Sequence, residues 1–199
     1  EPVPRFLPGA NSYSGGTTVI EGTLQGTTES LRGSIANNAA VVFDQTATGT
    51  YADVMSGSGA LIKSGAGTLI LSGANSYSGG TIINAGTVLI TPVIPSVSAA
   101  LIANKKANVA AGSNRTSADT SQVAAGALPT ATMLTVNGGV LDFNDISSSV
   151  TNLSGTGGSI LLGIGTLTVG QAATGSFAGA ILGSGGLIKN GAATLTLTG

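Results

Sequence analysis

The sequence contains no cysteine, histidine or tryptophan, and charged residues are scarce: seven Lys or Arg and eight Asp or Glu among 199 residues. Without Cys and His there is no zinc finger, no catalytic cysteine, no Ser-His-Asp triad and no disulfide scaffold. The net charge is −1 and the cations are scattered. Because no basic stripe can neutralise phosphates, we expect no nucleic-acid partner.

A long hydrophobic run is also missing. The most apolar stretch, 88–103, is shorter than the roughly 20 residues that span a bilayer, and Pro92 and Pro95 interrupt it. We therefore expect no membrane insertion of this segment. The chain starts at Glu1 without a basic region followed by an apolar one, so no signal peptide is visible, and we expect that residue 1 is not the start of the precursor.

Small and hydroxylated residues dominate what remains. The chain has 32 Gly, 25 Thr and 22 Ser, yet 42% of its residues are apolar. Its mean hydropathy of +0.42 is too high for a solvated, disordered coil. The sequence must therefore bury many apolar side chains while making many glycine turns.

Two internal repeats reveal the organisation. Residues 9–24 and 73–88 share GANSYSGGT and are identical at 11 of 16 positions, at an offset of 64. Residues 57–73 and 183–199 are identical at 12 of 17 positions, at an offset of 126, close to twice 64. The two halves join without interruption at 57–88, which indicates a unit of about 32 residues. We therefore expect a piece of a longer solenoid that starts and stops inside repeats.

Alternation of apolar and polar residues within the repeats predicts strands with one buried face. In TLTLT (194–198) and TLILS (68–72) the leucines should point inward and the threonines outward. The expected strands are 60–63, 68–72, 81–83, 88–90, 134–136, 140–143, 160–162, 166–169 and 194–198. Short strands with glycine corners on a long period favour an all-β parallel β-helix over a β-sandwich. If the offset of 64 makes three turns, one turn takes about 21 residues and there are at most about nine turns, roughly 4.8 Å apart.

One segment departs from this pattern and divides the chain into 1–95, 96–128 and 129–199. Residues 96–128 contain 10 Ala and no alternating strand. Ser98 could cap a helix over 99–111 that ends at Gly112. The segment is interpreted as a loop or short helix that leaves the β-helix, either as a tolerated excursion, as a binding protrusion or as an extra layer against the β-helix.

Few residues have the character of a functional site. Asp142 and Asp145 are the one close carboxylate pair, and we expect a turn-forming role rather than glycan hydrolysis. Lys63 and Lys189 occupy equivalent repeat positions, for which we expect solvated outer positions. Tyr13 and Tyr77 also recur, and stacking of one ring over the other is favoured over covering the core near a corner. We assign no catalytic, cofactor-binding or metal-binding residue.

The joined unit GSGALIKSGAGTLILSGANSYSGGTIINAGTV (57–88) resembles the passenger-associated transport repeat of bacterial autotransporters, also called the autotransporter-associated β-strand repeat. Residues 9–24 and 183–199 match its halves. The resemblance implies a right-handed parallel β-helix that is exported through the periplasm and through an outer-membrane β-barrel, its own translocator. It also implies a repeat that supports secretion and folding of the passenger. A chain without cysteine can cross such a pore unfolded without a disulfide obstructing it.

These observations predict a non-catalytic passenger segment at the bacterial surface. It would act as a stalk or adhesin scaffold towards host cells, matrix components or neighbouring bacteria. The alternative is a β-helical polysaccharide-degrading enzyme or a toxin fragment, which would use Asp142 and Asp145. A third hypothesis is an ice-binding solenoid, but its threonine rows should recur on every turn and here occur only at 68–72, 166–168 and 194–198.

Overall fold

The computed structural model of the chain describes residues 5–6, 9–91, 128–130 and 132–199, and contains strands but no helix among them. The strands are β1 (Arg5–Phe6), β2 (Thr17–Val19), β3 (Thr23–Gly26), β4 (Ile35–Asn37), β5 (Ala40–Asp44), β6 (Gly49–Tyr51), β7 (Met55–Ser56), β8 (Ala60–Ser64), β9 (Thr68–Leu71), β10 (Thr81–Ile83), β11 (Thr87–Ile90), β12 (Met133–Val136), β13 (Val140–Asp142), β14 (Ser148–Val150), β15 (Asn152–Ser154), β16 (Ser159–Gly163), β17 (Leu167–Val169), β18 (Gly175–Phe177), β19 (Ala180–Gly183), β20 (Leu187–Lys189) and β21 (Leu195–Leu197). Each predicted strand is present, with bounds that differ by at most one residue at either end.

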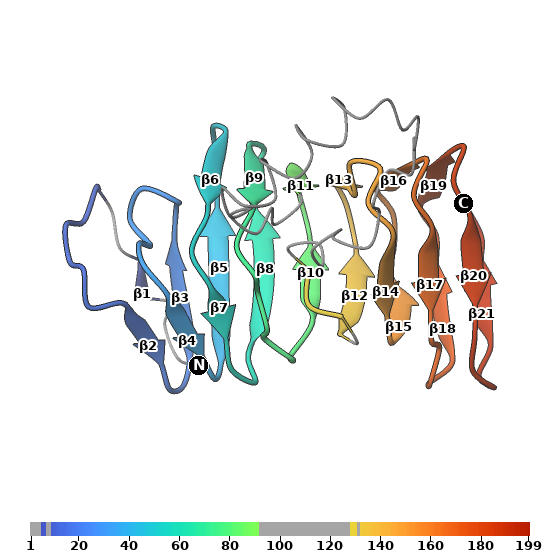
Figure 1. Cartoon of the computed structure of the whole chain (residues 1–199), viewed down its shortest axis with the longest axis horizontal. Helices are drawn as coiled ribbons and strands as arrows, with labels where there is room; N and C mark the ends of the chain where they lie inside the picture. The colour runs from blue at the N-terminus through green and yellow to red at the C-terminus, as the bar shows by residue number, and fades with distance from the viewer. Residues whose placement is uncertain (1–4, 7–8, 92–127, 131) are drawn as a thin grey trace, which may run out of the picture.

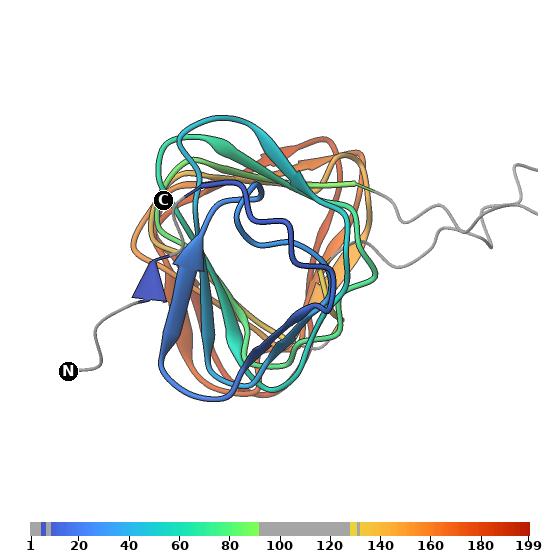
Figure 2. The same cartoon turned by 90° about the vertical axis from the view of Figure 1, so that its left-hand side faces the viewer.

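Every pair of neighbouring strands is parallel, and the strands form three faces of one tube. The first face is β1-β3-β5-β8-β10-β12-β15, continued by β18-β21. The second face is β6-β9-β11-β13-β16-β19, and the third face comprises β2-β4-β7 and β14-β17-β20. Each turn passes the third, first and second face in that order, for about seven turns (Figure 1). Seen along the axis, the turns superpose around one closed tube (Figure 2), and the predicted β-solenoid is confirmed.

The length of a turn differs from the prediction. Side-chain hydrogen bonds between neighbouring turns join positions 20 apart, as from Met55 to Asn75, or 19 apart, as from Thr135 to Ser154. The paired strands have the same spacing, since Leu61 is the partner of Thr81. The turn length expected from the repeat offset was therefore too long. The error came from treating that offset as a whole number of turns.

The length of the sequence repeat is not a whole number of turns of the tube. Three turns lead from Thr17 to Ile35, Met55 and Asn75. The repeat equivalent of Thr17, however, is Thr81, which lies further along the chain than Asn75. As a result TTV lies on the third face as β2, whereas its repeat TII lies on the first face as β10. One repeat unit supplies five strand positions, whereas one turn of the tube has three, one on each face. A unit therefore does not fill a whole number of turns, and the next unit begins on a different face.

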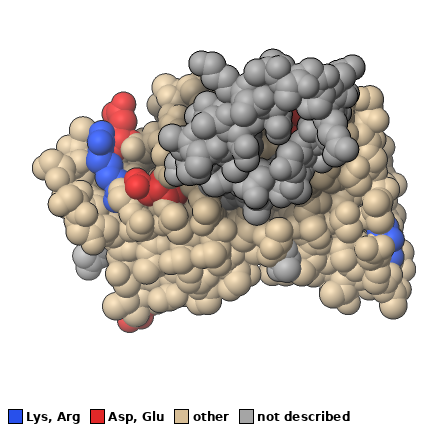
Figure 3. All heavy atoms as spheres, viewed as in Figure 1, with Lys and Arg blue, Asp and Glu red and all other residues tan. Residues whose placement is uncertain are grey.

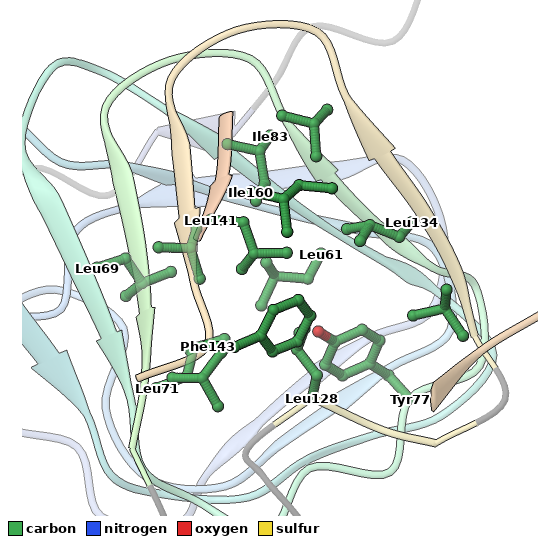
Figure 4. Close-up of a cluster of buried hydrophobic side chains, with 14 of the residues drawn as sticks. Leu61, Leu69, Leu71, Tyr77, Ile83, Leu128, Leu134, Leu141, Phe143 and Ile160 are labelled. Atoms are coloured by element: carbon green, nitrogen blue, oxygen red, sulfur yellow. The ribbon is translucent and has the colours of Figure 1, made fainter. Parts of the chain in front are cut away.

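Apolar side chains that alternate along the strands fill the interior. Leu61, Leu69 and Leu71 are fully buried, as alternation predicted for the last two. Side chains from the first and second faces converge on one another, among them Leu61 and Leu141 (Figure 4). Because each fully buried side chain of this size contributes about 1.5–3 kcal/mol, this stack is the main stabilising element of the tube.

The excursion is inserted between β11 and β12, which are adjacent turns of the tube. The connection from β9 to β10 in the turn before takes only residues 72–80, whereas the chain runs from Thr91 to Thr132 before β12 begins. Thr81 still pairs with Leu134 across the insertion. The side-chain Nδ2 of Asn137 likewise donates to the Asn84 Oδ1 at 3.0 Å, although the two residues are 53 positions apart in sequence.

The insertion also explains the longer of the two repeat offsets. That offset, 126, spans the excursion and is therefore not a doubling of the offset of 64. The predicted helix over 99–111 lies outside the described residues, as does all of 96–128 except Leu128, which is buried.

Candidate functional surface

Lys63 lies inside the tube, so the prediction of a solvated outer position was wrong. Its side chain is fully buried, and Nζ donates to the carbonyl oxygens of Gly65 (2.7 Å), Ala85 (3.3 Å) and Ser64. Burial lowers the pKa of Lys63, and the nearby Asp44 carboxylate partly offsets this effect. The alternation of β8 contained the signal: Leu61 and Lys63 are two residues apart and therefore point to the same side.

Lys189 makes the same local contact but is exposed. Its Nζ donates to the carbonyl of Gly191 (3.0 Å), as Lys63 does to Gly65. Both glycines have positive φ, 72° and 82°, a conformation that turns the carbonyl towards the lysine at little cost in glycine alone. The Lys-x-Gly sequence is thus a corner in which the ammonium binds the turn it precedes.

The two recurring tyrosines do not stack on each other. Tyr77 is fully buried and its hydroxyl shares a 2.7 Å hydrogen bond with Thr81, whereas Tyr13 is 36% exposed and accepts a 2.9 Å bond from the Thr17 hydroxyl. Burial raises the pKa of Tyr77. What recurs is therefore a Tyr–Thr hydrogen bond across four residues, and the favoured stacking role was wrong.

Asp142 and Asp145 form a turn, as predicted. One oxygen of Asp142 accepts a bond from the amide of Asn144 (2.8 Å), and one oxygen of Asp145 accepts from the amide of Ile164 in the next turn (2.9 Å). Asn144 and Asp145 both adopt left-handed backbone, at φ 49° and 66°, which Asn and Asp tolerate better than most residues. Both carboxylates thus have a role in closing the corner after β13.

Buried amide side chains join neighbouring turns at other corners, and sequence reasoning missed all of them. Gln45 accepts a bond from the Thr28 amide (2.9 Å) and Gln171 accepts from the Leu153 amide (3.3 Å). Asn75 accepts from the amide of Met55 (2.8 Å). Each replaces a main-chain bond where the strand ladder is interrupted, and no buried side-chain nitrogen or oxygen of the described residues lacks a partner.

The outer surface is poor in charge. In Figure 3 most of the visible described surface is uncharged, and the acidic and basic groups gather mainly over the first turns. On the second face, aligned outward positions form a row of Thr50, Ile70, Leu89, Asp142, Leu161 and Leu182. A hollow of about 290 Å³ lies on the third face. It is lined by Leu128 and by residues that carry a hydroxyl group: Thr130, Ser147, Ser148, Ser149, Thr166 and Thr168.

Groups that could hold a metal ion or cross a membrane are not found in the described part of the chain. No three His, Cys, Asp or Glu side chains gather there. Those residues also include no helix with the length and apolar character that a bilayer requires.

The chain is similar to one protein family and to one autotransporter adhesin. The passenger-associated transport repeat model matches residues 6–25, 61–90 and 187–199. The chain is 35% identical over 200 residues to the adhesin BmaC autotransporter of Brucella suis biovar 1 (strain 1330). That alignment covers 96% of this chain and 5% of the relative, so the chain spans a small part of the relative's length. No solved structure matches the chain significantly.

Proposed function

Because the chain is an autotransporter passenger segment built on the transport repeat, we propose that it is a non-catalytic stalk and adhesin scaffold at the bacterial surface. The observation that carries this proposal is the continuous parallel ladder. Neighbouring turns hydrogen-bond along the whole described length, on both sides of the excursion. Such a tube holds whatever it displays at a fixed distance from its base.

The excursion is the part of the chain that departs most from the scaffold. It is inserted in the sequence between β11 and β12, and the turns on either side of it remain paired through Thr81 and Leu134. A rigid scaffold that tolerates an insertion without losing register is suited to displaying it, since binding residues are commonly placed on loops. We therefore place contact with a host cell, a matrix component or a neighbouring bacterium on the excursion and the adjoining faces.

Secretion is the second part of the proposal. The repeat supplies local corners, the Lys-x-Gly and Tyr–Thr contacts, that close within a few residues of sequence. A chain emerging through its own outer-membrane translocator would form these contacts early, and each new turn would then find a template in the turn before. The repeats would thereby favour folding outside the cell and surface localisation.

Adhesion by the purified chain tests the stalk proposal. Beads coated with the full chain should bind host cells, matrix proteins or beads carrying the same chain. A variant in which the connection 72–80 replaces 91–132 should keep its β-rich circular dichroism and lose most of this binding. A variant with residues 92–127 scrambled at constant composition controls for length and charge. Binding that is equal in all three chains would contradict the role of the excursion.

The enzymatic alternative is tested in the same material. Incubation with bacterial and host glycans should release no new reducing ends or unsaturated products. Release that disappears in the Asp142→Asn and Asp145→Asn variants, with the fold intact, would overturn the non-catalytic proposal.

A further inference from the structure

A second recurring sequence precedes the first half of the transport repeat. Residues 45–52 are QTATGTYA and residues 171–178 are QAATGSFA, identical at five of eight positions. Their offset is 126, the same as that between 57–73 and 183–199, so the two copies run in register over 45–73 and 171–199 with 17 of 29 positions identical. None of the ranges that the transport repeat model matches includes either glutamine sequence.

Both copies fold into the same corner. Gln45 and Gln171 are buried, the three residues after each are exposed, and the aromatic side chain six positions on is buried again. The glutamine Nε2 lies so close to the glycine four positions on that a Cβ added at Gly49 or Gly175 would collide with it. The corner therefore needs both the glutamine and the glycine, which accounts for the spacing that recurs.

Each glutamine binds the main chain of the turn before it. Oε1 of Gln45 accepts a hydrogen bond from the Thr28 amide (2.9 Å), and Oε1 of Gln171 accepts one from the Leu153 amide (3.3 Å). Thr28 lies in a turn after β3, whereas Leu153 lies within β15. Because the two donors differ in residue type and in secondary structure, the glutamine recognises the N–H group itself, which every residue except proline carries.

The Nε2 groups find their acceptors in two different ways. Nε2 of Gln45 donates to the Thr28 hydroxyl (3.2 Å), whereas Nε2 of Gln171 donates to the carbonyl of Ala173 within its own corner (2.7 Å). In both corners the buried amide is thus paired at its nitrogen and at its oxygen, as burial requires. The contact of Oε1 with the preceding turn is the feature that the two corners share.

The corner is also independent of its place around the tube. Gln45 lies between the first and the second face, and Gln171 lies between the third and the first. Four strands follow each glutamine: β6, β7, β8 and β9 in one copy and β18, β19, β20 and β21 in the other. Each strand of the second copy lies one face earlier in the turn than its counterpart. The whole unit is therefore rotated together with its glutamine corner.

We propose that the repeat unit of this chain begins at the glutamine corner, and that Gln45 and Gln171 are positioning residues that dock the unit on the turn before it. A unit docked through an N–H group can follow a turn of any sequence and can start on any face. The inference rests on the proposed role of the repeat in folding. It names the part of the unit that joins a locally formed repeat to the rest of the tube.

Hydrogen exchange of single amides, followed by NMR on the purified full chain, tests the two docking contacts. Gln45→Met and Gln171→Met keep the length of the side chain but remove both polar groups. Gln45→Met should speed exchange of the Thr28 amide at least about tenfold, and Gln171→Met should do the same at Leu153. Each variant leaves an amide in the preceding turn without its acceptor.

Gln25→Met is the matched control. Gln25 is a half-buried glutamine of β3 whose Nε2 donates to the Asp44 carboxylate (2.9 Å). This variant should leave exchange at Thr28 and Leu153 unchanged. Wild-type exchange in the variants of Gln45 and Gln171, or equal acceleration in the control, would overturn the docking role.

Variants of Thr28 test whether the N–H group is what Gln45 recognises. Thr28→Ala keeps the amide and removes the hydroxyl, whereas Thr28→Pro removes the amide at the second position of the turn 27–30, where proline is favoured. Gln45→Met should lower the urea midpoint in the wild type and in Thr28→Ala, and should have little further effect in Thr28→Pro. The same lowering in all three backgrounds would show that Gln45 only fills space, and would overturn its docking role.

Refolding from urea distinguishes this inference from the proposed function on which it rests. A Gln45→Met chain with faster exchange at Thr28 but the wild-type refolding rate would support the docking corner and contradict the role of the repeat in folding. Unchanged exchange at Thr28 contradicts the docking corner itself, whatever the refolding rate or the outcome of the bead assays.

Discussion

The joined repeat at 57–88 and the last turn at 183–199 have nearly the same sequence but different surroundings. Leu61 and Leu187 are equivalent, yet one is fully buried and the other 37% exposed. Lys63 and Lys189 make the same bond to the following glycine, yet only Lys63 also reaches the next turn. The bond from the lysine to the glycine thus forms between residues close in sequence. The burial of the leucine, in contrast, depends on a further turn that stacks on it.

The largest expected difference concerns the paired leucines. Leu61→Ala should lower the free energy of unfolding by about 2–5 kcal/mol, because it removes transfer energy and leaves a cavity between stacked turns. Leu187→Ala should cost less than about 1 kcal/mol, because solvent already reaches that side chain. Urea denaturation followed by circular dichroism measures both. Equal losses would show that the last turn is as well packed as the inner ones.

The glycine corners should behave alike in both copies. Gly65→Ala and Gly191→Ala each place a Cβ on a residue with positive φ and against a carbonyl of the preceding turn, that of Gln45 or of Gly170. Each should cost about 1–3 kcal/mol of local stability. Hydrogen exchange of the flanking strand amides measures that stability without requiring global unfolding. A cost confined to Gly65 would mean that the last corner is not formed in solution.

The lysines should differ by the number of carbonyls they satisfy. Lys63→Met keeps the aliphatic chain but leaves the partly buried carbonyls of Gly65 and Ala85 without this donor, and should cost about 1–3 kcal/mol. Lys189→Met should leave the denaturation midpoint unchanged, since water replaces the ammonium there. A Lys63→Met variant as stable as the wild type would show that hydrophobic packing compensates fully.

The smallest difference is expected for the tyrosines of the second half repeat. Tyr77→Phe removes a buried hydroxyl bonded to Thr81 and should cost about 0.5–1.5 kcal/mol. Tyr13→Phe removes the equivalent bond to Thr17 at a half-exposed site and should cost less. Thermal unfolding of the two variants side by side gives the comparison. A larger effect at Tyr13 would contradict the expectation that the more deeply buried hydroxyl contributes more.

Periodicity predicted the strands because alternation depends only on which side chains must be buried. The same rule, applied to β8, places Lys63 inside, although a lysine usually prefers solvent. The corner amides Gln45 and Gln171 could not be predicted, since their partners are 17 and 18 residues away on neighbouring turns. The turn role of Asp142 could be predicted because an Asx turn needs only the backbone two residues on. The partner of Asp145, the amide of Ile164, lies 19 positions away and could not.

The sequence by itself determined the strand positions, the glycine corners and the inward alternation of leucine, because each follows from contacts within a few residues. Only the tertiary structure decided the length of a turn and the face on which each repeat lies. The repeat unit is longer than one turn and shorter than two, so the number of strands per turn fixes the rotation. The bond from Lys63 to Ala85 was likewise decided there, because this acceptor belongs to the following turn.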